Sequence, residues 1–223
     1  MGEQKYIPTA SAAAGAAIYT KRLLSVYDLA VIKLSNQLAW RCPAQLTLDF
    51  YNQHISANHL EVGVGTGYYL DRCRFPSSTP RLVLLDLNPN SLQIAAQRLH
   101  RYHPTVQLAN VLEPLQCDVP AFDSIALNYV LHCLPGTMQS KQVVFDNLKP
   151  WLNPAGVVFG TTILGQGLRP NYLARKLMQL YNAKGIFSNR QDNLSDLEAI
   201  LKRSFRDYWT QVVGCVAFFS GRV

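Results

Sequence analysis

The stretch His59-Leu60-Glu61-Val62-Gly63-Val64-Gly65-Thr66-Gly67 decides the fold of this chain. It is a short apolar segment that carries one acid and then enters a turn with glycine at three alternate positions. Glycine has no Cβ and tolerates positive φ, so backbone N–H groups in such a turn can approach a ligand closely. The pattern predicts a buried strand over 58–62 that ends in a ligand-binding turn.

A second acid, Asp86, follows the next apolar segment, Leu82-Val83-Leu84-Leu85. Two neighbouring strands that each end in a carboxylate beside a turn are typical of a nucleoside-binding crevice in a parallel sheet. A nicotinamide dinucleotide site would need a third glycine where Tyr68 stands, and Glu61 would repel its pyrophosphate. The acid favours S-adenosylmethionine, which is cationic and has no phosphate, while Asp86 suits the ribose hydroxyls of either ligand.

Apolar segments with strand and helix periodicity alternate along the chain. Strands are predicted over 58–62, 81–87, 105–109, 122–128 and 156–163, and helices over 66–73, 90–102, 137–152 and 194–204. This alternation predicts an α/β fold with a doubly wound, mostly parallel sheet covered by helices on both faces. A single domain over 1–223 is expected, with an N-terminal helical cap (18–56), a cofactor-binding core (57–164), a lid-like insertion (165–192), and a terminal helix with an antiparallel strand pair (193–223).

Composition excludes several classes of protein. The chain has 223 residues, 48% of them hydrophobic and only 16% charged, which indicates one globular domain. No apolar run is long enough to span a bilayer, and the five cysteines form no C-x-x-C pair, so we expect a reduced, cytoplasmic protein without a zinc site. The formal charge of +7 is spread along the chain, which makes a nucleic-acid partner less favoured than an ordinary basic enzyme.

Four segments in chain order resemble the class I S-adenosylmethionine-dependent methyltransferases, in the small-molecule group that includes the ubiquinone/menaquinone type. They are Leu60–Gly67, Leu85–Asn88, Phe122–Asn128 and Leu152–Val157, the last with Ala155 where the family has glycine. The resemblance covers 59–163. It implies a seven-stranded sheet, S-adenosylmethionine as cofactor, and methyl transfer to a small, hydrophobic organic acceptor, such as a secondary metabolite or a quinone. Asn128 stands where a metal-dependent site would need clustered acids, so we expect no metal.

The same resemblance implies roles for individual residues. The three glycines would line the methionine and ribose portions, Glu61 would hold the ammonium end directly or through water, and Asp86 would take the ribose diol. The full cofactor-binding set is Glu61, Gly63, Gly65, Gly67, Asp86, Leu87, Asn110, Val111, Asn128 and Tyr129. Leu87, Asn110 and Val111 would meet the adenine, and Asn128 and Tyr129 the methionine portion.

His132 is the candidate catalytic residue, because an imidazole that titrates near neutrality suits proton removal from an acceptor. Its alternative is a purely structural role. The acceptor pocket is predicted to use Tyr19, Tyr27, Trp40 and Tyr172, although their helical spacing equally fits a core stripe. The other histidines, His59 among them, are expected at element ends in contact with solvent.

The sequence leaves the acceptor, the methylated atom and the oligomeric state open. One alternative is an enzyme of the same scaffold that performs a cyclisation and keeps the cofactor only as a cationic group. Another is an RNA or protein methyltransferase that uses the positive charge.

Overall fold

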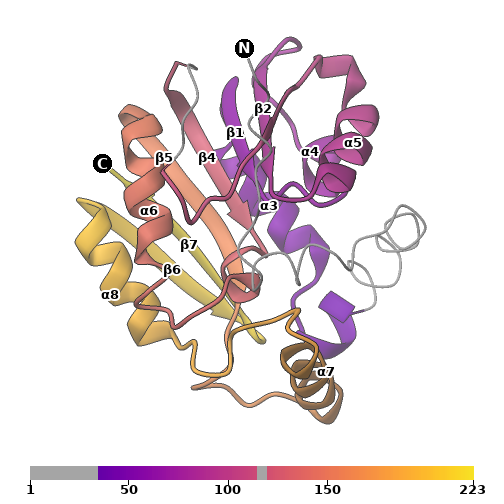
Figure 1. Ribbon diagram of the computed structural model, residues 1–223, viewed down its shortest axis with the longest axis vertical. Helices are drawn as coiled ribbons and strands as arrows, with labels where there is room; N and C mark the ends of the chain where they lie inside the picture. The colour runs from indigo at the N-terminus through magenta and orange to yellow at the C-terminus, as the bar shows by residue number, and fades with distance from the viewer. Residues whose placement is uncertain (1–34, 115–119) are drawn as a thin grey trace, which may run out of the picture.

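The computed structural model describes residues 35–114 and 120–223 (Figure 1). Tyr19 and Tyr27, and the first part of the helical cap predicted over 18–56, lie outside the described residues, as does Cys117.

Seven strands form one sheet in the order β3-β2-β1-β4-β5-β7-β6. They are β1 (Asn58–Val62), β2 (Arg81–Asp86), β3 (Thr105–Leu108), β4 (Phe122–Asn128), β5 (Leu152–Ile163), β6 (Asp207–Val213) and β7 (Val216–Arg222). The first five are parallel, and β7 pairs antiparallel with both β5 and β6. The strand order reverses between β1 and β4, which places a crevice at their carboxyl ends. The predicted doubly wound, mostly parallel fold is confirmed.

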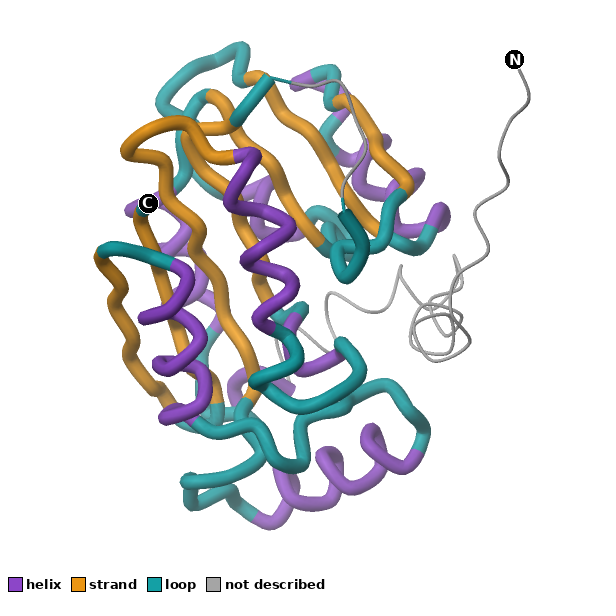
Figure 2. The backbone as a smooth tube through the Cα atoms, turned by 60° about the vertical axis from the view of Figure 1, so that its left-hand side comes forward, coloured by secondary structure: helices purple, strands orange, loops and turns teal. Residues whose placement is uncertain are grey.

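Helices cover both faces of this sheet (Figure 2). The α-helices within the described residues are α3 (Ala44–His54), α4 (Tyr68–Arg72), α5 (Pro89–Arg98), α6 (Gln142–Leu148), α7 (Tyr172–Ala183) and α8 (Leu194–Ser204). Because strand residues alternate in direction, Leu84 belongs to the hydrophobic cluster that includes residues of α3, α4 and α5, whereas its neighbour Leu85 belongs to the cluster that includes residues of α6 and α8. In Figure 1, α6 and α8 lie in front of the strands, and α7 lies beyond their lower end.

Several element boundaries differ from the sequence prediction. The helix predicted over 66–73 begins at Tyr68, because Gly67 has a φ of 72° and cannot be part of it. The helix predicted over 90–102 ends at Arg98, and a separate 3-10 turn, η2 (His100–Tyr102), follows.

The segment between β4 and β5 differs more strongly from the sequence prediction. The helix predicted over 137–152 is confined to α6, because residues 138–141 form turns before it and Pro150 lies in a 3-10 turn, η4 (Lys149–Trp151), after it. Strand β5 begins at Leu152 instead of 156. Ala155 takes a left-handed φ of 66°, the conformation that glycine would adopt more easily.

Candidate active site

The glycine turn after β1 has left-handed backbone at Gly63, Gly65 and Gly67, with φ of 69°, 54° and 72°. A Cβ on Gly63 would lie 2.5 Å from Cγ2 of Val130, and one on Gly67 would lie 3.3 Å from Cβ of Ala95. A Cβ on Gly65 would meet nothing within 4 Å. The outer glycines are therefore required by packing, whereas Gly65 leaves its backbone open to a ligand.

Asp86 joins this turn to the end of β2. Its Oδ2 accepts from the N–H of Gly65 at 3.4 Å and its Oδ1 from the N–H of Asn88 at 2.8 Å. Burial raises the pKa of this carboxyl to about 6, against the opposing effect of these N–H donors. Asp86 thus stands at the crevice with lone pairs available to a diol.

Glu61 lies beneath the turn and is only 3% exposed. Tyr51 of α3 donates its hydroxyl to Oε1 at 2.6 Å, and Nε2 of His59 lies 3.1 Å from Oε2. Burial raises the pKa of Glu61, while His59 and Tyr51 oppose that rise. The structure therefore adds two partners to the acid predicted to hold the ammonium end, and each carboxylate oxygen keeps a further lone pair.

The expectation that His59 contacts solvent is wrong, because its side chain is fully buried. His59 and Glu61 are two residues apart on β1, so both side chains point to the same face of the sheet. That face is covered by α3 and α4, which brings the imidazole to the carboxylate instead of to water.

Asn128 is the last residue of β4, and Tyr129 follows it at the crevice. The Oδ1 of Asn128 accepts from the hydroxyl of Thr161 at 3.2 Å, but its buried Nδ2 has no hydrogen-bond partner in the part of the chain that the structure describes. Tyr129 has a φ of 59°, and its ring stacks on that of Tyr69 at 6.3 Å. A buried donor without a partner, close to an open glycine backbone, fits a site that a polar ligand completes.

The predicted adenine side is only partly assembled. The N–H of Ala109 donates to the carbonyl of Asp86 at 3.2 Å, which brings the end of β3 to the crevice. Asn110, however, uses Oδ1 to accept from the N–H of Leu112 and Nδ2 to donate to Glu113. Val111 is buried, and Leu87 is partly exposed beside Asp86. Asn110 thus shapes its own loop in this structure.

His132 lies in a 3-10 turn, η3 (Leu131–Cys133), just after β4, and is 2% exposed. Its ring lies 4.5 Å from that of Phe187 and 6.1 Å from that of Tyr129. Its Nδ1 accepts from the N–H of Ile163 at 3.3 Å, so the neutral ring carries its proton on Nε2. Burial, and then the charge of Lys141, lowers the pKa of His132 to about 3.

Hydrogen bonds and an ion pair hold the segment after β5 next to His132. The N–H of Ser188 donates to the His132 carbonyl at 2.7 Å. Lys141 donates to the Ser188 carbonyl at 2.8 Å and to Oδ2 of Asp192 at 2.6 Å, in an ion pair that is almost fully buried. Ser188 and Asp192, at the base of the predicted insertion (165–192), are therefore held against the core.

The predicted acceptor residues are not all brought together. Trp40 is buried, and its ring lies 6.0 Å from that of Phe187, close to His132. Tyr172 begins α7 with 68% of its surface exposed, and the ammonium of Lys176 lies 5.7 Å from its ring. The structure thus places Trp40, but not Tyr172, beside the other candidates.

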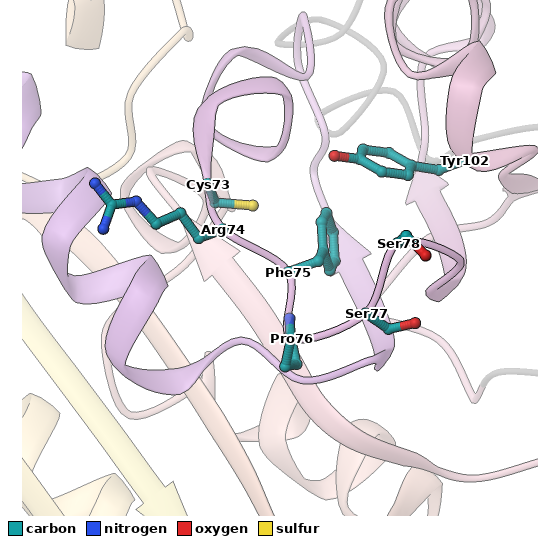
Figure 3. A pocket seen from close by; sticks show the side chains of 7 residues that line it. All are labelled: Cys73, Arg74, Phe75, Pro76, Ser77, Ser78 and Tyr102. Atoms are coloured by element: carbon teal, nitrogen blue, oxygen red, sulfur yellow. The ribbon is translucent and has the colours of Figure 1, made fainter.

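A surface hollow of about 410 Å³ lies elsewhere (Figure 3). It is lined by Cys73, Arg74, Phe75, Pro76, Ser77, Ser78 and Tyr102. These residues come just before β2 and β3, at the amino ends of the strands, whereas the glycine turn lies at their carboxyl ends. The hollow is therefore separate from the crevice.

Within residues 35–114 and 120–223, no group of three or more histidine, cysteine or acidic side chains could hold a metal ion. Within them, too, no helix is both long enough and apolar enough to cross a membrane.

The sheet order, the glycine turn and the acids after β1 and β2 define a class I S-adenosylmethionine-dependent methyltransferase. A family model described as a methyltransferase domain matches residues 60–158. The chain is 43% identical to demethylluteothin O-methyltransferase of Streptomyces thioluteus, over 92% of this chain and 89% of that protein. It is 38% identical to the physcion biosynthesis cluster O-methyltransferase of Aspergillus chevalieri, over 92% and 93%.

The chain therefore belongs to the S-adenosylmethionine-dependent methyltransferases. Its fold also matches the structure of a DhpI–SAH complex with a TM-score of 0.69 at 13% identity, over 96% of this chain and 98% of the other. The protein is an enzyme that uses S-adenosylmethionine to methylate a small organic acceptor. The more specific likeness to the quinone group is minor.

Sequence reasoning missed the residues that surround the site from other elements. His59 could have been found, because the spacing i, i+2 on a strand places it beside Glu61. Tyr51, Ser124 and Phe187 carry no local signal, because their positions depend on which helix or loop covers the sheet.

Proposed function

We propose that the enzyme methylates an oxygen atom, and that the acceptor is a hydrophobic molecule with an acidic hydroxyl such as a phenol or enol. The two relatives above carry O-methyltransferase in their names, which supports oxygen as the acceptor atom. The aromatic side chains of Trp40, Phe187 and Tyr129 near His132 support a flat, apolar acceptor.

The protonation state of His132 is the observation that supports an acceptor with an acidic hydroxyl. A pKa near 3 makes its imidazole a weak base at neutral pH, and its only unprotonated nitrogen already accepts from Ile163. The predicted base role therefore stays a prediction, and we favour a weaker form of it. In that form the neutral ring orients the acceptor oxygen, and the acceptor ionises by itself.

For the cofactor we propose the set of residues at the crevice. Bound S-adenosylmethionine supplies a methyl carbon that its sulfonium already activates for displacement, so the chain mainly has to align the two reactants. Gly63, Gly65 and Gly67 would present the backbone, Asp86 would accept from the ribose diol, and Glu61 would attract the ammonium. Leu87, Asn110 and Val111 would border the adenine, and Asn128 and Tyr129 the methionine portion.

We also propose that residues 165–192 cover the acceptor, within a single domain over 1–223. The backbone carbonyl of Asp192 accepts from the N–H groups of Gly165 and Gln166 at 2.9 and 3.0 Å, which closes the base of this insertion. Together with the Lys141–Asp192 pair, these bonds support a fixed base and a more exposed α7. The described cysteines are free, which is compatible with a reducing compartment such as the cytoplasm.

The test is a pH–rate profile with a series of phenols of different acidity and labelled S-adenosylmethionine. If the acceptor ionises by itself, the inflection moves with the pKa of each phenol. If a protein base removes the proton, the inflection stays at one pH for all acceptors. Transfer to amines or carbon acids at rates above those of every phenol would refute oxygen as the target. The two named relatives are O-methyltransferases that match this chain over most of their length. Their names favour this function over a cyclase and over an RNA or protein methyltransferase.

A further inference from the structure

A buried acid–imidazole pair lies under the glycine turn. His59 Nε2 is 3.1 Å from Oε2 of Glu61, and the Tyr51 hydroxyl occupies the other oxygen. Both members of the pair are almost completely removed from water. A buried carboxylate is costly unless hydrogen bonds and an opposite charge compensate it. The protonation state of this pair therefore sets the net charge of the site floor.

A chain of hydroxyl groups continues behind the imidazole. Nδ1 of His59 lies 2.7 Å from Oγ of Ser124, which lies 2.9 Å from Oγ of Ser56. Ser56 donates its own hydroxyl proton to the carbonyl of Asn58 at 2.8 Å. With that proton committed, the Ser124 hydroxyl can donate either to Ser56 or to the imidazole.

Rotation of that one hydroxyl serves both states of the ring. A neutral His59 can accept from Ser124 at Nδ1 while it donates from Nε2 to Glu61. A protonated His59 can donate from both nitrogens, while Ser124 turns its proton toward Ser56. The imidazole can therefore gain or lose a proton with every polar atom still paired, which a single fixed partner would not allow.

The other titratable groups around the pair do not supply a positive charge. Burial and Glu61 raise the pKa of Tyr51 well above its ordinary value and that of Cys73 to about 12, so both stay neutral. His54 and His59 both lie near the ring of Phe159, with ring centroids 5.3 and 6.0 Å away. Burial lowers the pKa of His54, which also favours its neutral form.

We propose that His59 competes with the ammonium group of the cofactor for the Glu61 carboxylate, so that binding releases a proton from the pair to solvent. The inference rests on the proposed placement of the ammonium end at Glu61. With a protonated ring the floor is neutral, whereas with a neutral ring it carries one negative charge that the ammonium can balance. His59 is thus a positioning residue that acts through Glu61.

The first experiment uses the unmodified protein. Calorimetric titrations with S-adenosylhomocysteine in two buffers of different ionisation enthalpy count the protons released. They are repeated with 5′-methylthioadenosine, which has the same ribose and adenine but no amino-acid portion, from about pH 5.5 to pH 8.5. We expect extra proton release with S-adenosylhomocysteine at the acidic end. Equal release for the two ligands at every pH would overturn the proposal.

Variants assign the proton to a residue. His59→Gln keeps a neutral N–H donor toward Glu61, so the extra release should vanish. The ratio of the two affinities should then become independent of pH, with a gain over the unmodified protein of up to about tenfold per pH unit at the acidic end. A merely structural role would weaken both ligands alike and leave this ratio unchanged. The matched control His54→Gln should behave like the unmodified protein.

Glu61→Gln tests the placement of the ammonium at Glu61 separately from the role of His59. It should reduce the preference for S-adenosylhomocysteine over 5′-methylthioadenosine by about ten- to hundredfold, the usual loss for a charged hydrogen bond. An unchanged preference would show that the ammonium is not placed at Glu61. A lost preference together with persistent proton release in His59→Gln would show that the proton leaves Glu61 itself, and the role of His59 would be refuted.

Discussion

The hydroxyl of Tyr51 lies 2.6 Å from Oε1 of Glu61, although the two residues belong to different layers of the fold. Tyr51 comes from α3, before the sheet begins, and Glu61 comes from β1. Their bond makes the position of α3 part of the proposed cofactor site. A helix that the sequence presents only as an amphipathic element thereby helps to hold a buried acid.

Tyr51→Phe should destabilise the protein and weaken the cofactor site together. The change leaves one oxygen of a buried carboxylate without its donor, which costs about 1–3 kcal/mol of unfolding free energy. Chemical denaturation measures the stability, and calorimetry with S-adenosylhomocysteine measures the affinity. Tyr208→Phe, on the exposed edge strand β6, is the control and should change neither quantity. A stable variant with unaltered affinity would show that the bond is unimportant.

Asp86→Asn should remove one pH-dependent part of the stability and weaken nucleoside binding. The pKa of Asp86 is raised from 3.8 to about 6 by burial, so its ionised form opposes folding. Stability from this group is thus present at low pH and lost as pH rises from about 4 through 6, by at most about 3 kcal/mol.

The asparagine variant should lose this part of the pH dependence in denaturation experiments from about pH 4 to pH 8. The affinity of the unmodified protein for 5′-methylthioadenosine should fall as pH drops through about 6, since the ionised carboxylate is the better acceptor for the diol. An affinity that is flat across this range would argue against Asp86 as the ribose ligand.

Alanine substitutions should distinguish the glycines of the turn. Gly65→Ala has only the strain of positive φ, about 1 kcal/mol, but its methyl group enters the open side of the backbone, so cofactor affinity should fall at least about tenfold. Gly63→Ala should lose about 1–3 kcal/mol more stability, because its methyl group meets Val130 at 2.5 Å.

Gly167→Ala is the matched control for these two variants. It has a φ of 76° and open space around its Cβ position, but it lies in the insertion. It should show the same backbone strain as Gly65→Ala in thermal unfolding and retain normal cofactor affinity. Equal affinities for the two variants would mean that no ligand approaches Gly65.

Lys141→Met should be strongly destabilising, because it leaves Asp192 buried without its cation. Removal of one partner from such a pair costs about 3–5 kcal/mol. The double variant Lys141→Met/Asp192→Leu should recover most of this loss. A double-mutant cycle of unfolding free energies measures the coupling. Additive effects of the two single changes would show that the ion pair does not hold the insertion against the core.

Local sequence determined the strands, the glycine turn and the position of the two acids. Strand β4 and helix α8 begin and end at the predicted residues. The short apolar run Ile125-Ala126-Leu127 marks the first, and Asn193, whose side chain accepts from the N–H of Asp196 at 2.9 Å, starts the second. Gly63 and Gly67 could likewise be identified, since the need for positive φ is a property of the chain itself.

Tertiary structure alone decided the surroundings of these residues. The burial of His59, the bond from Tyr51 to Glu61, and the ion pair between Lys141 and Asp192, which are 51 positions apart, depend on which elements lie against each other. Periodicity fixes the face on which a side chain lies, but a partner from a distant segment is selected only when the layers pack. For that reason the sequence was enough to propose two acids for the cofactor site, and only the fold showed which groups surround each carboxylate.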